Sequence, residues 1–212
     1  MENFFITGTD TEIGKTYVTC ALLRDLRARG LHALGFKPLA CGDRSDPRAM
    51  RDAVGEPSLS LDIINPIYLR TPAAPYIAAE MEQRPLSLDE ITTAYKQLAS
   101  QYSPVLVEGA GGWEAPLAPG LTMADLAKAL GLPVVLVVGN KLGAVNHAIL
   151  TVKAIRAIGL ECRSIVLNHY GEEWDAASVS NCRLIEEFTG VSVQAELIHG
   201  QADINSRAVL GC

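Results

Sequence analysis

Short, unbroken runs of apolar residues alternate along this chain with longer stretches in which apolar residues recur at helical spacing. The apolar runs, rich in β-branched residues, are Phe4–Thr7, Ala33–Phe36, Val105–Val107, Val134–Val138, Ile165–Leu167 and, more weakly, Val191–Leu197. The helical stretches are Lys15–Arg29, Leu88–Tyr102, Met123–Leu130, Ala144–Ile158 and Ala176–Phe188. Strands that are apolar on both faces are typical of a parallel sheet covered by helices on each side. The alternation therefore predicts a doubly wound α/β fold with a mainly parallel sheet.

The length of 212 residues suits a single domain, residues 1–212. We expect the proline-containing stretch Asn65–Arg84 to be a surface excursion and not a domain boundary. The chain ends soon after Gly200, and we expect Ala208–Cys212 to be poorly ordered.

The charge and the cysteines narrow the class of protein. The chain carries 24 acidic and 18 basic side chains, for a formal net charge of −6, without a Lys/Arg run, so a nucleic-acid partner is not expected. The segment Met1–Thr7 lacks the basic and apolar regions of a signal peptide, and the longest apolar run, Leu132–Val138, is too short to span a bilayer. Five cysteines without a C-x-x-C pair indicate reduced thiols and no zinc site. We therefore expect a cytoplasmic protein without a membrane segment.

The first apolar run leads into the segment Gly8–Thr16, which reads Gly-Thr-Asp-Thr-Glu-Ile-Gly-Lys-Thr, and a helix is predicted directly after it. A strand, a glycine-bounded loop and Gly-Lys-Thr at a helix start are the context of a phosphate-binding loop. Backbone N–H groups and the positive end of the helix face the anion in such a loop. Lys15 can neutralise the β- and γ-phosphates of a nucleotide, and the Thr16 hydroxyl can ligate Mg²⁺. These features predict a P-loop NTPase-like fold.

The spacing of this loop is a variant. The common pattern G-x-x-x-x-G-K-[ST] would place a glycine at position 9, where Thr9 stands, while Gly8 lies one residue too early. A glycine turn before an exposed helix is the alternative that this motif alone leaves open.

The segment Gly8–Thr16 resembles the G-T-D-T-x-x-G-K-T loop of the dethiobiotin synthetase family. Three further segments, each following a predicted strand, resemble the same family in the same order: Lys37–Ala40, Glu108–Trp113 and Lys141–Ala148. They match the family patterns K-P-x-x, E-G-A-G-G and K-L-G-x-x-N-H. Together the four motifs span most of residues 4 to 170.

The resemblance implies a homodimeric P-loop-type α/β enzyme, a cyclo-ligase of biotin biosynthesis with ATP as co-substrate and Mg²⁺ as cofactor. The family joins 7,8-diaminononanoate, CO₂ and ATP into dethiobiotin, ADP and phosphate. One amine forms a carbamate, ATP phosphorylates the carbamate to a mixed anhydride, and the second amine closes the cyclic urea.

The resemblance also implies roles for individual residues. Lys15 should hold the β- and γ-phosphates, Lys37 should lie between the carbamate and the γ-phosphate, and Thr11 should donate to the carbamate. Two lysines at one anionic centre repel each other, so such a site suits bound anions. For Lys37 alone, a solvated lysine at a strand end is the alternative.

The expected magnesium ligands are Thr16, Glu108 and an aspartate after the second strand, because Mg²⁺ prefers oxygen ligands. Asp43, Asp46 and Asp52 compete for the third place. Ser45-Asp46-Pro47 is typical of a helix start, with Asp46 at the N-cap, and its distance to Asn65-Pro66 suits the family better than that of Asp52. We therefore choose Asp46.

The remaining expected contacts follow the family motifs. The residues expected at ATP are Glu12, Ile13, Gly14, Lys15, Thr16, Tyr17, Asp46, Glu108, Gly109, Ala110, Gly111, Asn168, His169, Ile198, His199 and Gly200. The residues expected at the substrate are Cys41, Gly112, Gly143 and Asn146. In this family the segment of Gly143 and Asn146 reaches the site of the partner subunit, so the dimer would be functional. Helix capping and packing are the alternative for Asn146.

Two departures from the family pattern leave questions open. Cys41 stands where the family often has serine or threonine, and a thiol is a weak hydrogen-bond donor. Ala195–Gly200 stands where the family usually has a G-x-I-P-like segment around the base, and it lacks the proline. The nucleotide preference is therefore open, with ATP expected.

Two other functions are compatible with a phosphate loop. A nucleotide-switched partition ATPase would carry an extra lysine early in the loop, where Asp10 stands. An amide-forming ligase of the same superfamily, of the cobyrinate type, usually has an added glutaminase domain, for which 212 residues leave no room.

Overall fold

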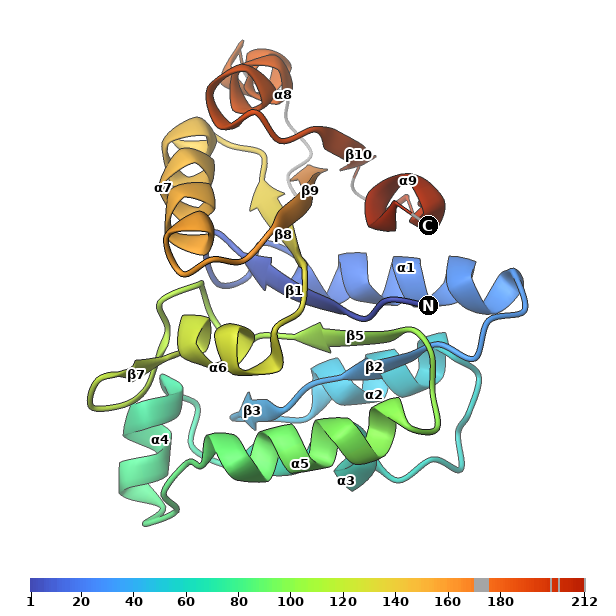
Figure 1. Ribbon diagram of the computed structural model, residues 1–212, viewed down its shortest axis with the longest axis vertical. Coiled ribbons are helices and arrows are strands. Elements are labelled where there is room, and N and C mark those ends of the chain that lie inside the picture. Colours follow the sequence, from blue (N-terminus) through green and yellow to red (C-terminus); the bar gives the residue numbers. More distant parts are fainter. Residues whose placement is uncertain (170–175, 199, 202, 212) are drawn as a thin grey trace.

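A computed structural model describes residues 1–169, 176–198, 200–201 and 203–211 (Figure 1). The strands are β1 Phe4–Gly8, β2 Leu34–Phe36, β3 Leu39–Cys41, β4 Ile67–Leu69, β5 Val105–Glu108, β6 Pro116–Ala118, β7 Leu121–Thr122, β8 Val134–Gly139, β9 Cys162–His169 and β10 Val193–Ile198. The helices are α1 Lys15–Ala28, α2 Ser45–Ala53, α3 Leu61–Ile64, α4 Pro75–Met81, α5 Leu88–Ala99, α6 Met123–Leu130, α7 Ala144–Ala157, α8 Ala176–Thr189 and α9 Ser206–Leu210.

The main sheet has six strands in the order β10-β9-β8-β1-β5-β2, and every neighbouring pair is parallel. The strands β1, β5 and β8 consist entirely of buried residues, which is why their sequences are unbroken apolar runs. The predicted doubly wound, parallel α/β fold is confirmed.

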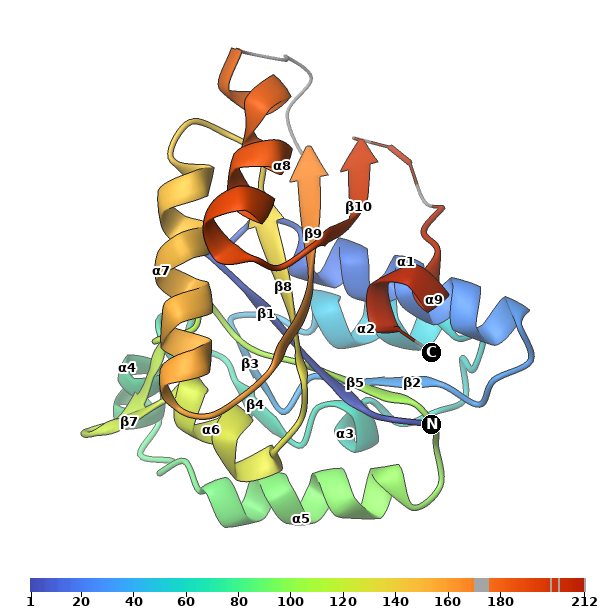
Figure 2. The same ribbon diagram turned by 45° about the horizontal axis from the view of Figure 1, so that its top comes forward.

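Helices cover both faces of this sheet (Figure 2). On one face, α1 packs against β1, β2 and β5 and also contacts α2 and α9. On the other face, α7 packs against β8 and β9 and contacts α8, while α5 contacts α6. None of the helices in the described part of the chain is long and apolar enough to cross a membrane.

The direction of the connections changes at the centre of the sheet. From β1 the chain passes through α1 to β2 at one edge, whereas from β5 it passes through α6 to β8 on the far side of β1. Adjacent strands whose connections leave in opposite directions open a crevice beyond their carboxyl ends, where ligands bind in sheets of this type. In this chain the crevice lies beyond β1 and β5, whose last residues are Gly8 and Glu108.

The expectation of a surface excursion at Asn65–Arg84 is wrong. Asn65 is 1% exposed, Ile67 and Leu69 are fully buried, and β4 pairs in parallel with β3 in a second, two-stranded sheet. A strand of three residues is too short for its alternation to stand out in the sequence.

The expectation of a poorly ordered C-terminus is also wrong for residues 208–211, while Cys212 lies outside the described residues. Val209 and Leu210 are fully buried in α9, and the Ser164 hydroxyl donates to the carbonyl of Val209 at 2.6 Å. Residues 208–211 are held in place because α9 packs against β9, β10 and α1.

Candidate active site

The phosphate loop connects β1 to α1 and leaves the start of α1 free. Gly14 is the N-cap of α1 in the left-handed region (φ 87°), a conformation that favours glycine, and no side chain caps the helix. The first N–H groups of α1 therefore remain available to an anion. Lys15 folds back over the loop, where its ammonium donates to the carbonyl of Asp10 at 2.8 Å.

Lys15 is buried, and its charge is destabilised in the absence of an anion. Burial and, after it, the positive charge of Lys37 lower the pKa of Lys15 to about 8. Phosphate oxygens supply the negative charge that this ammonium lacks, so the arrangement favours an anionic ligand.

Lys37 follows β2 and lies buried at the floor of the site. Its ammonium donates to Asp46 Oδ2 at 2.8 Å, to Glu108 Oε1 at 2.7 Å and to the carbonyl of Gly109 at 3.3 Å. Burial opposes the charge, but Glu108 and Asp46 outweigh it and raise the pKa of Lys37. All three donors of this cation are therefore engaged.

Glu108 ends β5 and is fully buried. Besides Lys37, it accepts hydrogen bonds from the Thr16 hydroxyl at 2.7 Å and from the Thr19 hydroxyl at 2.6 Å. The carboxylate of Asp46 also lies beside the Thr16 hydroxyl, and its side chain is 39% exposed. Burial acts to raise the pKa of Asp46, but Lys37 and Thr16 outweigh it and lower that pKa.

The three expected magnesium ligands therefore meet at one point. No group of three His, Cys, Asp or Glu side chains suited to a metal occurs among the residues that the structure describes. Here the ammonium of Lys37 lies between the two carboxylates, and the Thr16 hydroxyl donates to one of them, Glu108, so this position already holds a cation. Magnesium usually takes few protein oxygens and keeps several waters, so this donor set fits the ion.

The start of α2 distinguishes Asp43, Asp46 and Asp52, the three candidates for the third magnesium ligand. The helix begins at Ser45 with Arg44 as its N-cap, so the prediction of Asp46 as N-cap is wrong. Asp43 accepts from the backbone N–H of Ser45 at 2.8 Å and satisfies this end of the helix. The carboxylate of Asp46 is thereby free to meet Lys37, whereas Asp52 is 67% exposed and pairs with Arg51.

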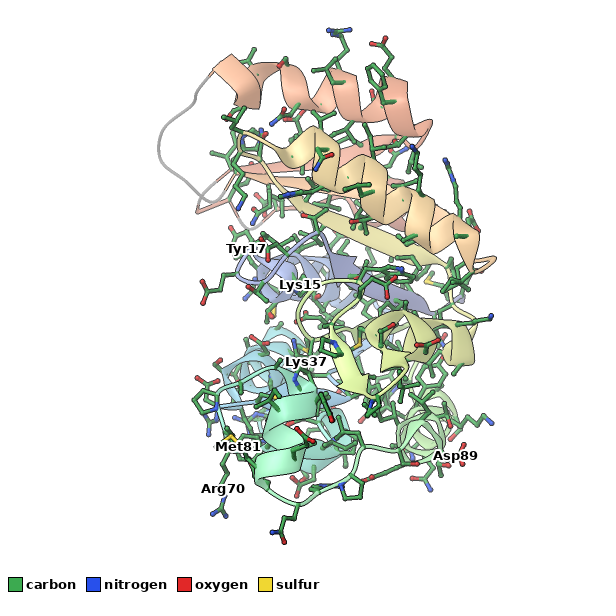
Figure 3. All side chains as sticks on the ribbon, turned by 90° about the vertical axis from the view of Figure 1, so that its left-hand side faces the viewer. Lys15, Tyr17, Lys37, Arg70, Met81 and Asp89 are labelled. Carbon is green, nitrogen blue, oxygen red and sulfur yellow. The ribbon has the colours of Figure 1, made fainter. Side chains whose placement is uncertain are left out.

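A cleft of about 1020 Å³ opens above these residues. Figure 3 shows Lys15 and Lys37 one above the other on the side where the cleft opens. The expected site residues that line it are Thr11, Glu12, Gly14, Lys15, Thr16, Lys37, Cys41, Asp46, Glu108, Ala110, Gly111 and Gly112. The structure thus brings together the phosphate loop, the segment that begins at Lys37, the loop that begins at Glu108, and Asp46, as the motifs predicted.

Other expected ATP contacts lie beside the cleft. Ile13 is buried in the core, and Gly109 contributes its carbonyl to Lys37. Asn168 ends close to the phosphate loop, where its amide donates to the carbonyl of Ile13 at 2.8 Å, and the Tyr17 hydroxyl donates to the carbonyl of Gln201. These contacts place the ends of β9 and β10 next to the start of α1.

His169 is buried and is held by the Asn140 amide and by Glu196, 3.0 Å from its ring. Ile198 is 47% exposed, Gly200 is exposed, and His199 lies outside the described residues. These placements leave the base contacts as predictions.

Gly143 and Asn146 do not line the cleft. Gly143 is the left-handed N-cap of α7 (φ 92°), and Asn146 is exposed in the first turn. Their place at the surface is compatible with both alternatives, a contact to a partner subunit and a plain helix start.

The sequence did not predict the wall of the cleft that faces the phosphate loop. This wall is formed by Pro72, Ala73, Ala74 and Pro75, between β4 and α4. The sequence signal for this wall is the Pro-Ala-Ala-Pro segment, which lies within the stretch Asn65–Arg84 that we expected to be a surface excursion.

Comparisons with known proteins identify the family. A family model described as an AAA domain matches residues 2–200. The ATP-dependent dethiobiotin synthetase BioD of Akkermansia muciniphila is 51% identical over 201 residues, which cover 95% of this chain and 94% of that protein. The ATP-dependent dethiobiotin synthetase BioD of Anaeromyxobacter dehalogenans is 44% identical over 214 residues, which cover 98% of this chain and 94% of that protein.

Solved structures show the fold alone. A ParA family ATPase from Chlorobium tepidum aligns with a TM-score of 0.59 at 14% identity, covering 99% of this chain and 91% of that one. The MinD cell division protein of Aquifex aeolicus aligns with a TM-score of 0.57 at 13% identity, covering 93% of this chain and 82% of that one. The sequence relatives decide the family, and the chain belongs to the dethiobiotin synthetase family.

Proposed function

We propose that this chain catalyses the ATP-dependent closure of 7,8-diaminononanoate and CO₂ to dethiobiotin, with release of ADP and phosphate. One observation carries the proposal: Lys15 and Lys37 come from separate strand ends and face one cleft, whose floor holds Glu108 and Asp46. Close similarity to the dethiobiotin synthetases over nearly the whole chain supports the same reaction.

The reaction needs a leaving group on a poor electrophile. One amine adds to CO₂ and loses a proton, and the resulting carbamate oxygen attacks the γ-phosphorus of ATP, which releases ADP. The second amine then attacks the carbamoyl carbon and displaces phosphate, which closes the ring. Lys15 neutralises the phosphates, and Lys37 and Thr11 orient the carbamate, so the protein acts through positioning and charge.

The same proposal includes Mg²⁺, held by Thr16, Asp46 and Glu108. Bound magnesium neutralises charge on the transferred phosphoryl group. For Lys37 to contact the carbamate, it must release at least one of its acceptors, since its three donors are engaged by Asp46, Glu108 and Gly109.

A homodimer with the substrate site at its interface is also part of the proposal. Leu142 is 80% exposed and Leu150 is 57% exposed, on either side of Gly143 and Asn146. Leu142 lies just before α7 and Leu150 lies within it, and both would lose their exposure if another subunit covered this end of α7. A mixture of Lys37→Ala and Asn146→Ala enzymes tests this, because shared sites would restore activity that each variant alone lacks.

A cytoplasmic location completes the proposal. The cysteines Cys20, Cys41, Cys162 and Cys182 are free thiols, which suits a reducing compartment.

Phosphate release tests the function. The proposed ligase should release phosphate only when both the diamine and bicarbonate are present, and dethiobiotin should form in equal amount. Phosphate release without either compound would instead support a nucleotide-switched ATPase, whose fold this chain shares.

A further inference from the structure

Glu82 lies outside the cleft and yet contacts the start of one of its walls. Its carboxylate accepts a hydrogen bond from the backbone N–H of Thr71 at 2.7 Å. Thr71 immediately precedes Pro72–Pro75, the wall of the cleft that faces the phosphate loop. Figure 3 shows α4, which begins with this wall and ends near Met81, just below Lys37.

A carboxylate is unfavourable at the C-terminal end of a helix. Glu82 is the C-cap of α4, where the negative end of the helix dipole disfavours an acid. The hydrogen bonds from the backbone of Thr71 and Arg70, together with the positive charge of Arg70, offset this cost and lower the pKa of Glu82. A charge-assisted bond to a backbone N–H is stronger than a neutral one, so Glu82 ties the end of α4 to the start of the loop.

At its far end the wall is held by the buried Pro75, which begins α4, whereas its first residues have few backbone hydrogen bonds. Pro72 and Pro75 have no N–H group, and the Ala73 N–H bonds within the loop, to the carbonyl of Thr71 at 2.9 Å. Pro72 packs directly against Gly42, since a Cβ atom on Gly42 would lie 3.0 Å from Pro72. Any outward shift of the loop would therefore open a gap beside Gly42 and Cys41.

The wall is apolar, and so are Leu39 and Ala40, which also line the cleft. The charged groups Lys37, Asp46 and Glu108 line the same cleft. A ligand that fills the cleft must therefore combine a polar reacting end with an aliphatic part, as a diamino acid with an alkyl chain does.

We propose that Glu82 is a positioning residue that holds the Pro72–Pro75 wall against the alkyl chain of the substrate. The inference rests on the proposed function for the identity of that substrate. Glu82 does not touch the substrate, and it acts on the binding of the diamine without acting on ATP or on the reacting atoms.

The test compares three variants. Glu82→Ala removes the acceptor, and Glu82→Gln keeps an acceptor oxygen for Thr71 without the charge. Glu80→Ala is the matched control, because it removes a carboxylate of α4 that bonds Tyr76 and not the wall. For Glu82→Ala we expect the KM for the diamine to rise about tenfold, which equals about 1.4 kcal/mol. We expect kcat and the KM for ATP to stay within about twofold of the wild type, and Glu82→Gln and Glu80→Ala to resemble the wild type.

Amide hydrogen exchange separates this inference from the proposed function. The Thr71 amide should be protected in the wild type and in Glu80→Ala, and it should exchange at least about tenfold faster in Glu82→Ala. Unchanged exchange overturns the inference, and so does faster exchange with an unchanged diamine KM or a parallel rise in both KM values. If the wild type forms no dethiobiotin, the proposed function is refuted. The hydrogen-exchange result alone then decides whether Glu82 holds the wall.

Discussion

Replacement of Lys37 by alanine tests the centre of the site in two ways. The ammonium of Lys37 neutralises Glu108, which is fully buried, and Asp46. Removing one partner of a buried ion pair costs about 3–5 kcal/mol. The hydroxyls of Thr16 and Thr19 still donate to Glu108, so we expect the lower end, about 3 kcal/mol. For a chain of this size that loss corresponds to a fall in Tm of about 6–12 °C.

The assay is thermal unfolding with and without Mg²⁺, in the absence of nucleotide. A divalent cation can take the place between Glu108 and Asp46 that the ammonium leaves, so magnesium should raise the Tm of Lys37→Ala more than that of the wild type. Lys37→Met is the control, because it keeps the apolar stem and removes only the charge. The double variant Lys37→Ala/Glu108→Gln should recover stability, since a neutral amide needs no cation.

Catalysis provides the second measurement. We expect Lys37→Ala to lose at least about a thousandfold in dethiobiotin formation, as for a donor that acts on developing charge, while nucleotide binding stays largely intact. A variant with an unchanged Tm, or with a near wild-type rate of product formation, would refute the role given to Lys37.

Three further predictions follow from the same geometry. Glu108→Gln should shift the magnesium titration of activity to at least about tenfold higher concentration, and an unchanged titration rejects Glu108 as a ligand. Because burial and then Lys37 lower the pKa of Lys15 to about 8, free Lys15 loses its proton as the pH rises through 8 and bound phosphates restore it. Affinity for ATP should therefore fall above pH 8. Calorimetry of ATP binding at pH 8 in two buffers should show uptake of about half a proton. Zero proton uptake would contradict the lowered pKa of Lys15. Val209→Asp should destabilise the fold by at least about 3 kcal/mol in urea unfolding, because it buries a charge beneath α9; an unchanged midpoint would mean that α9 is dispensable.

The parts of the site that the sequence predicted are those where local pattern and position coincide. A buried parallel strand must read as an apolar run, and the polar residue that ends it must lie at the crevice. Lys37 and Glu108 follow such runs, so their convergence could be expected before any contact was known. Lys15 and Thr16 were predicted for the same reason, since the loop, the helix start and the charge belong to one continuous segment.

The parts that escaped prediction depend on contacts between distant segments. The wall Pro72–Pro75 follows a strand of three residues, and its place is set by Glu82 and Gly42, which no periodicity connects to it. The helix α9 is also too short to show a helical period. Its order comes from Arg29 and Asp25 of α1, which bond Ser206 by its hydroxyl and its N–H.

The charges of the cleft explain why this fold can carry a ligase site. Lys15 and Lys37 are balanced by Asp46 and Glu108, and each lysine is held by protein acceptors: Lys15 by the carbonyl of Asp10, Lys37 by the two carboxylates. A nucleotide triphosphate and a carbamate both add negative charge next to Glu108, which cannot reach solvent. The anions are therefore stabilised only if both ammonium groups turn toward them and another cation replaces Lys37 between the carboxylates. That exchange of partners makes phosphoryl transfer depend on the bound anions, because Lys37 has all three donors engaged by Asp46, Glu108 and Gly109, whereas Lys15 uses one donor for the carbonyl of Asp10.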